Sequence, residues 1–142
     1  NAAPVDLSSW LTDGPGNWTL QTEVVANDSV FQSLNSGPSM FFNNMNSQGM
    51  ALSGSIEVQS ASDDDFVGFV LGYNDDDLFA GTTDYILIDW KQGTKSGWDA
   101  GMSISRVTGA INAGGTDTTA DAWTHTGNVS FIERAATLDS TG

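Results

Sequence analysis

Two runs of three aspartates flank one apolar segment of the chain. In the sequence DDDFVGFVLGYNDDDL, Asp63–Asp65 precede and Asp75–Asp77 follow the apolar segment Phe66–Tyr73. Carboxylates that crowd together repel one another, and a shared divalent cation relieves that repulsion. Calcium takes about six to eight oxygen ligands from carboxylates, backbone carbonyls and water. From these residues alone, the first run forms either a calcium site or an acidic turn exposed to solvent.

Three further carboxylates are weaker candidates for a metal site. Asp75 and Asp77 lie in the sequence NDDDL, which also suits a hairpin loop exposed to solvent, and this second interpretation is favoured. Asp89 interrupts the apolar run YILIDW. A buried carboxylate needs a partner, so we expect Asp89 to be either hydrogen-bonded in the core or bound to a metal ion.

The segments around these aspartates have the pattern of β-strands, and helical periodicity is almost absent. Trp18–Val25 and Ala51–Gln59 alternate between apolar and polar residues. The runs 66–73 and 84–90 are nearly continuous apolar stretches, as expected of central strands covered on both faces. The short apolar runs, separated by Gly, Ser, Thr and Asn, are Met40–Phe42, Phe66–Tyr73, Asp84–Trp90, Gly101–Val107 and Asn128–Arg134. The pattern predicts an all-β antiparallel sandwich.

Composition limits the classes of partner. The chain has 142 residues, 18 Asp and Glu against 4 Lys and Arg, and a formal net charge of −14. Nucleic acids and anionic lipids need clustered Lys and Arg, so neither is expected as a partner.

The chain has no cysteine and therefore no disulfide. No apolar run approaches the roughly 20 residues of a membrane span, so no membrane insertion is expected. The sequence starts at Asn1 without a charged and apolar leader, so we expect that any signal peptide has been removed; the initial Asn agrees with processing or with a trimmed sequence.

Four motifs resemble one known family when taken in order. They are DDDFVGFVLGY (Asp63–Tyr73), YILIDWKQ (Tyr85–Gln92), GW (Gly97–Trp98) and WTHTGN (Trp123–Asn128). This series, within Ala51–Asn128, resembles the C-terminal lectin-like domain of thrombospondins and is similar to related domains of exported bacterial proteins. The resemblance implies a concanavalin A-like β-sandwich, or jelly roll, with calcium binding and an extracellular matrix or surface role.

The resemblance also changes the interpretation of the first aspartate run. It favours calcium at Asp63, Asp64 and Asp65, with Asp89 as a further candidate ligand. The chain departs from the family in the aspartates of the loop 75–77, where thrombospondins have a short polar turn. The sequence also stops soon after Asn128, where the family continues. We therefore expect a single sandwich domain over residues 1–142 that lacks the C-terminal strands of the family.

Two tryptophans are candidates for binding a glycan. Trp98 and Trp123 fall in Gly- and Thr-rich loops. An indole face stacks well against the C–H face of a sugar. The alternative is that they belong to the core, as is expected of Trp90 and of most Trp residues in a small sandwich.

The residues do not support catalysis. Glycosidases need two carboxylates across a cleft, and the only glutamates, Glu23, Glu57 and Glu133, fall on separate elements. His125 is the only histidine, which excludes a zinc site with several histidines. A single loop histidine is more often structural, so we expect no enzyme.

Two hypotheses for function follow from these features. The first is a secreted or cell-surface, calcium-binding, lectin-like module that acts in adhesion or in recognition of a glycan or an extracellular protein. The second is a structural subunit of a surface layer or filament. In that case, an open sheet edge with exposed apolar surface would be completed by a partner chain or by self-association.

Overall fold

The fold is all-β, with antiparallel strands throughout, which confirms the predicted class. The computed structural model describes residues 3–60, 66–94, 98–112 and 121–135. Within these ranges the strands form three antiparallel sheets, and one four-residue helix lies between β7 and β8 in the chain. β1 (Leu11–Asp13) pairs with β4 (Met40–Phe42), and β2 (Trp18–Gln21) pairs with β3 (Ser29–Gln32). The third sheet has the order β5 (Phe66–Leu71), β6 (Asp84–Lys91), β7 (Gly101–Thr108), β8 (Val129–Arg134), and α1 spans Asp121–Thr124.

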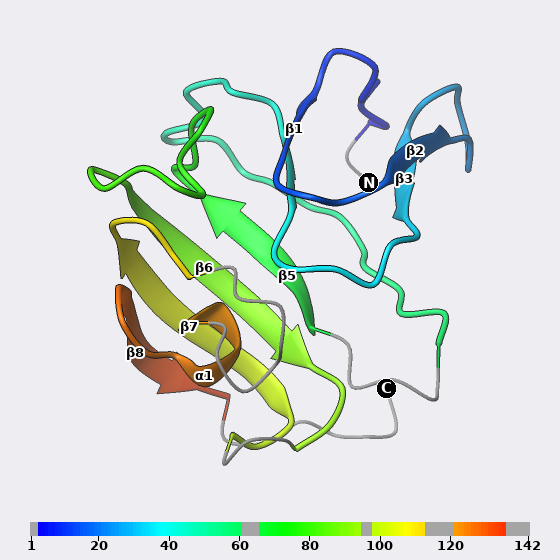
Figure 1. The fold of residues 1–142 in the computed structure, drawn as a ribbon. Coiled ribbons are helices and arrows are strands. Elements are labelled where there is room, and N and C mark those ends of the chain that lie inside the picture. Colours follow the sequence, from blue (N-terminus) through cyan, green and yellow to red (C-terminus); the bar gives the residue numbers. More distant parts are fainter. Residues whose placement is uncertain (1–2, 61–65, 95–97, 113–120, 136–142) are drawn as a thin grey trace.

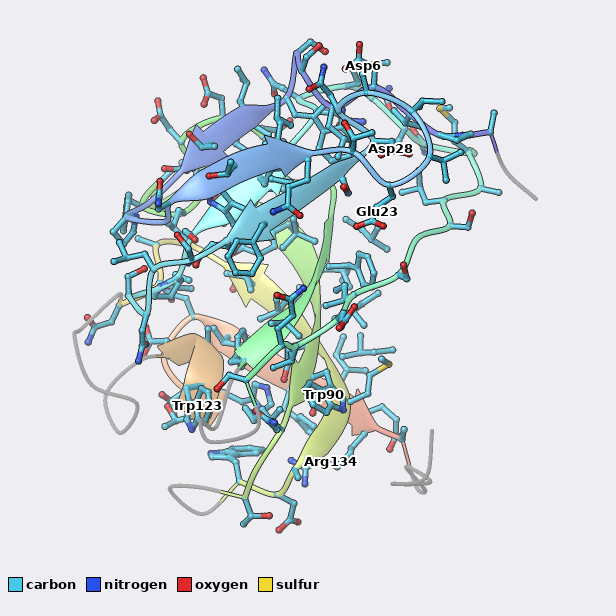
Figure 2. The ribbon with its side chains drawn as sticks, turned by 90° about the vertical axis from the view of Figure 1, so that its right-hand side faces the viewer. Asp6, Glu23, Asp28, Trp90, Trp123 and Arg134 are labelled. Atoms are coloured by element: carbon cyan, nitrogen blue, oxygen red, sulfur yellow. The ribbon has the colours of Figure 1, made fainter. Side chains whose placement is uncertain are left out.

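The strands β1–β4 lie together beyond one end of the four-stranded sheet. Figures 1 and 2 both show this arrangement, with the blue and cyan strands above the green-to-orange sheet. In Figure 1 helix α1 lies over β7 and β8. None of the helices that the structure describes is long and apolar enough to cross a membrane.

Strand alternation gives the four-stranded sheet two different faces. We call the face that carries Tyr85, Leu87, Asp89 and Lys91 the inner face, because all four residues are buried. On β7 the residues opposite them in the register, from Val107 back to Gly101, are buried as well, while the residues between are exposed. The opposite side is the outer face, and its residues on the central strands are half-buried or exposed.

The inner face carries the hydrophobic core at the end where the small sheets meet it. Phe42 of β4 packs edge-on against Tyr73, with ring centroids 4.9 Å apart, and Tyr73 packs edge-on against Tyr85 at 5.1 Å. The Tyr73 hydroxyl donates a 2.5 Å hydrogen bond to the Asp13 carboxylate, which ties β1 to the larger sheet. Burial raises the pKa of Tyr73 above its usual range, and the hydrogen bond to Asp13 adds to the shift. The other buried members of the core are Leu78, Leu87, Val107, Ile111, Ala122 and Val129.

A close approach of two strands explains the glycine in the middle of β5. Gly68 faces Asp89 in the register, and a Cβ on Gly68 would lie 2.0 Å from the Ile88 carbonyl oxygen. Side chains larger than hydrogen are therefore excluded at this position without movement of the backbone.

The structure corrects three predictions about the strands. Residues 51–59 form no regular strand, although their sequence alternates. β6 is central as predicted, but β5 is an edge strand of its sheet in the described part of the chain, and the outer-face residues of both strands are half-buried or exposed. The strand predicted at Trp18–Val25 ends at Gln21, because the Asp28 carboxylate accepts hydrogen bonds from three successive amides, those of residues 23–25, and turns the chain.

Candidate functional site

The inner face contains a buried cluster of charged side chains. Asp89 and Lys91 are two residues apart on β6 and therefore point the same way, and His125 reaches them from the turn after α1. Asp89 is 0% exposed and Lys91 is 1% exposed, and the His125 side chain is fully buried. His125 Nε2 lies 3.0 Å from Asp89 Oδ1, and Lys91 Nζ lies 3.8 Å from Asp89 Oδ2. We call these three residues the ion cluster.

The distances within the ion cluster indicate where the imidazole proton lies. Nε2 of His125 is 3.0 Å from the carboxylate of Asp89 and 3.4 Å from Nζ of Lys91. A ring nitrogen either donates or accepts, and an ammonium only donates. The shorter contact favours Nε2–H as a donor to Asp89, so that the contact with Lys91 is electrostatic. The Asp89 carboxylate then compensates the positive charge of Lys91 and orients the histidine.

Aromatic rings surround the lysine of the ion cluster. Nζ of Lys91 lies 5.6 Å from the ring centroid of Phe66, 5.4 Å from that of Trp98 and 5.8 Å from that of Trp123. The negative faces of aromatic rings attract a cation at such distances. Burial nevertheless lowers the pKa of Lys91, against the opposing effect of the Asp89 carboxylate. The rings exclude water while partly replacing the solvation that the ammonium loses.

The THTGN segment forms the turn that delivers His125. His125 has a φ of 48° and Gly127 a φ of 59°, both in the left-handed region. A Cβ on Gly127 would lie 2.7 Å from the carboxylate of Asp121, so the glycine allows that carboxylate to fit against the turn. Asn128 Nδ2 donates a 2.6 Å hydrogen bond to the carbonyl of Ala110, which joins the turn to the segment after β7.

The predicted metal ligands have different outcomes. Asp63, Asp64 and Asp65 lie outside the described residues, so their role stays a prediction. Asp75 is exposed, and Asp77 accepts hydrogen bonds from the amide and the side chain of Asn74, as in a capped loop.

The surroundings of Asp89 bear on its predicted role as a ligand. Over residues 3–60, 66–94, 98–112 and 121–135, no three His, Cys, Asp or Glu side chains gather where they would hold a metal ion. Asp89 instead faces Lys91 and His125, and a calcium site needs several oxygen ligands around it. Its described neighbours therefore do not make a calcium site, and the calcium role of Asp89 stays a prediction.

The two predicted sugar-binding tryptophans both belong to the surroundings of the ion cluster. Trp123 on α1 is 8% exposed and contacts Phe66. Trp98 is half-buried, with its ring centroid 4.5 Å from that of His125 and 5.8 Å from that of Phe131. Figure 2 shows Trp123 and Trp90 near the end of the sheet opposite β1–β4. A role of Trp98 and Trp123 in glycan binding stays a prediction.

Sequence reasoning missed the lysine of the ion cluster. The available signal was the spacing of Asp89 and Lys91, because two residues apart in a strand place both side chains on one face. An aspartate and a lysine on the same face of an apolar strand indicate a buried ion pair. The histidine that completes the cluster is 34 residues beyond Lys91 and required the fold to be found.

The outer face of the sheet is bordered by a groove of about 480 Å³. Strand β5, the outer side of β6 and Met102 of β7 line the groove on one side, and the irregular segment 54–58 lines the other. Gln92 Nε2 donates a 2.9 Å hydrogen bond to the carbonyl of Ser60. This bond holds the chain that follows the segment 54–58 near the end of β6. The lining residues are Gly54, Ile56, Glu57, Val58, Val67, Gly68, Phe69, Ile88, Trp90, Gln92 and Met102.

Together these features define an all-β domain in which the second and fourth sequence motifs meet in one buried ion cluster. Residues 16–128 match the family described as Thrombospondin C-terminal region, and the chain belongs to that family. The match extends the similarity found from the motifs back to the segment that contains β2, β3 and β4.

The chain is also similar to individual proteins of this kind. It is 32% identical over 82 residues to Thrombospondin-3b of Danio rerio, which covers 58% of this chain and 8% of the relative. It is 30% identical over 84 residues to Cartilage oligomeric matrix protein of Rattus norvegicus, covering 59% of this chain and 10% of that protein. The chain thus corresponds to a small part of these relatives. No solved structure matches the chain significantly.

Proposed function

We propose that the chain is a calcium-binding, lectin-like extracellular module that acts in adhesion or in recognition of a glycan or a partner protein. The observation that carries this proposal is the family match over residues 16–128, which includes the Asp63–Asp65 run immediately before β5. The family resemblance supplies the calcium, the lectin-like sandwich and the extracellular role, and the name of one relative refers to cartilage matrix.

The charges of the chain support the binding of a cation. The net charge is −14, and the described basic side chains are engaged with aspartates or buried. Arg106 makes two hydrogen bonds to Asp84, of 2.8 and 2.6 Å, and Arg134 contacts Asp99 at 3.0 Å. Lys91 is buried in the ion cluster. The remaining field of the surface attracts divalent cations and basic partners.

Described residues on both sides of the first aspartate run contact the end of β6. Ser60 precedes it and is bonded to Gln92, and Phe66 follows it and packs over Lys91. Asp63, Asp64 and Asp65 would hold the calcium ion, which would neutralise their mutual repulsion. Binding at this place would stiffen the entry into β5, the strand that borders the outer groove.

The role proposed is one of binding, without catalysis. The only histidine, His125, is buried between Asp89 and aromatic rings and serves to hold the turn after α1. A general acid or base must reach a substrate proton, directly or through one water.

Calorimetric melting tests the calcium part of the proposal. A ligand at about 100 times its dissociation constant adds about 2.7 kcal/mol to the free energy of unfolding, so a chelator should lower Tm by several degrees. Replacing Asp63, Asp64 and Asp65 by Asn should remove the effect of calcium. The matched control replaces Asp75 and Asp76 by Asn, which should preserve it. Equal Tm values with calcium and with chelator would reject calcium binding. A glycan array in the presence of calcium tests the lectin part separately.

A second candidate function is that of a structural subunit completed by another chain. The outer face favours it, since several large apolar side chains there are at least a third exposed. They are Phe69, Leu71, Met102 and Ile104. Light scattering tests this candidate, because a subunit of this kind should assemble with increasing concentration, and a monomer at all concentrations would contradict it.

A further inference from the structure

The two edges of the four-stranded sheet differ in how they are protected from further pairing. Edge strands expose unpaired backbone groups, and proteins protect them with charges and bulges. β8 carries Glu133 and Arg134, and its register with β7 shifts between Ile104 and Ser105. β5, with the sequence FVGFVL, carries no charged residue, and its pairing with β6 is regular from end to end. β5 is therefore the edge to which another strand adds most easily.

The groove lies beside this unprotected edge. Three consecutive β5 residues, Val67–Phe69, line it, and Ile56, Glu57 and Val58 line the facing wall. Phe69 and Leu71 are 45% and 42% exposed and project from alternate positions of β5 on the outer face. The volume of the groove, about 480 Å³, falls in the range of ligand-binding pockets, about 300–1,000 Å³. Figure 1 shows the segment after β4 running past the β5 side of the sheet, outside any strand.

Charge decides which strand would fit this place. Among the described residues that line the groove, Glu57 is the only charged one, and the chain as a whole has a net charge of −14. A second copy of the chain would bring the same net charge and be repelled at moderate salt. An extended segment with Lys or Arg between its apolar residues would be attracted, and its apolar side chains would cover the outer face.

We propose that the groove beside β5 binds an extended, basic segment of another protein, which adds to β5 as a further strand with apolar side chains at alternate positions. Main-chain hydrogen bonds to the β5 edge would supply affinity, and the apolar side chains would supply specificity. This inference names the partner class for the recognition role proposed above and rests on that role.

Binding of short labelled peptides by fluorescence anisotropy tests the inference on the unaltered chain. The probe is an eight-residue peptide of alternating Val and Lys. One control peptide replaces each Val by Ser with the same charge, and another carries N-methyl groups on alternate amides. We expect the first peptide to bind at least about tenfold more tightly than either control, because one lacks the apolar contacts and the other the main-chain donors. Equal binding of all three would overturn the proposal in favour of unspecific attraction.

Two variants locate the binding site. Phe69→Glu places a negative charge on β5, which would strengthen simple attraction of a basic peptide but should weaken strand addition about tenfold. The matched control Ile132→Glu changes a side chain of β8 that is 55% exposed, and it should leave binding unchanged. Unchanged binding to Phe69→Glu would overturn the proposal. So would a dimer of the unaltered chain in sedimentation that Phe69→Glu dissociates, since the occupant would then be a second copy.

Failure of the proposed β5 binding site can be distinguished from failure of the proposed calcium binding. Melting with and without chelator reports calcium binding by the same sample. Peptide binding without a calcium effect on Tm would reject calcium and retain the β5 site, whereas a calcium effect without peptide binding would reject the β5 site alone.

Discussion

The inner and outer faces of the same four strands differ in almost every physical respect. The inner face holds charges in a closed aromatic environment, where the Asp89 carboxylate contacts both Lys91 and His125. The outer face holds apolar side chains that remain partly open to solvent, beside a groove and an unprotected edge. The charged residues of the inner face therefore contribute to packing, and the outer face is the one to which we propose that a partner binds.

The ion cluster is better understood as a device that fixes structure than as a source of net stability. Removing two charges from water is costly, and their mutual attraction often repays no more than that cost. The cluster does bring together β6 and the turn after α1, which lie far apart in sequence. We infer that it selects the position of this turn on the inner face.

The largest effect is expected when the carboxylate of the ion cluster is removed. Asp89→Asn should lower the free energy of unfolding by about 3–5 kcal/mol, because it leaves the ammonium of Lys91 buried without a compensating charge. Urea unfolding followed by tryptophan fluorescence measures the loss.

A double replacement serves as the control for this prediction. Asp89→Leu combined with Lys91→Met removes both charges and should restore most of the loss, since apolar residues of similar volume replace a buried pair at little cost. If the single change costs less than about 1 kcal/mol, the Asp89 carboxylate does not compensate Lys91.

The next largest effect concerns the close approach of β5 and β6. Gly68→Ala should cost about 3 kcal/mol, since its Cβ would overlap the Ile88 carbonyl and force the two backbones apart. Gly81→Ala is the matched control, with no atom within 4 Å of the added Cβ, and should change stability little. Chemical denaturation measures both, and equal effects would contradict the account of β5.

Much of the fold was predictable from local patterns, and the site was not. The limits of β4 through β8 lie close to the predicted apolar runs, because the pattern that indicates a strand depends on residues that are neighbours in the sequence. The short strands β1 and β3 and the helix α1 have too few residues to show a period. The ion cluster joins Lys91 to His125 across the chain, and only tertiary packing brings them together. Residues 51–59 alternate like a strand, but alternation does not guarantee a partner.

A comparison of two buried tyrosines distinguishes the effect of a hydrogen bond on stability from the effect of burial alone. Tyr73→Phe should cost about 1.5 kcal/mol, because the Tyr73 hydroxyl donates to the Asp13 carboxylate. The Tyr85 hydroxyl is buried and, within the described residues, has no hydrogen-bond partner. Tyr85→Phe should therefore change stability by less than about 0.5 kcal/mol at pH 7. Denaturant melts at neutral pH compare the two, and a larger loss for Tyr85→Phe would contradict the assignment.

The same pair makes a prediction about alkaline pH. Burial raises the pKa of both tyrosines in the folded state above the usual value of about 10. Their contribution is fully present below about pH 10 and is lost as the pH rises further, because the unfolded chain releases the protons first. Tyr85→Phe should reduce the loss of stability above about pH 10, which unfolding at a series of pH values would reveal.

The smallest effects are expected on the outer face. Ile104→Thr should change the free energy of unfolding by about 0.5 kcal/mol, since Ile104 is 39% exposed. Val107→Thr, on the inner face of the same strand, buries an extra hydroxyl at a fully buried position and should cost about 1–3 kcal/mol. Similar losses would mean that the two faces of β7 are equally covered in solution.

Hydrogen exchange in calcium and in chelator tests the central claim most directly, because it reports the protection of backbone amides at the start of β5 and in the rest of the sheet in one experiment. The account predicts that removing calcium speeds exchange at the first amides of β5 and at Gln92, while the amides of β7 on either side of Ser105 keep their protection. Identical exchange in the two conditions would contradict a calcium-stabilised module.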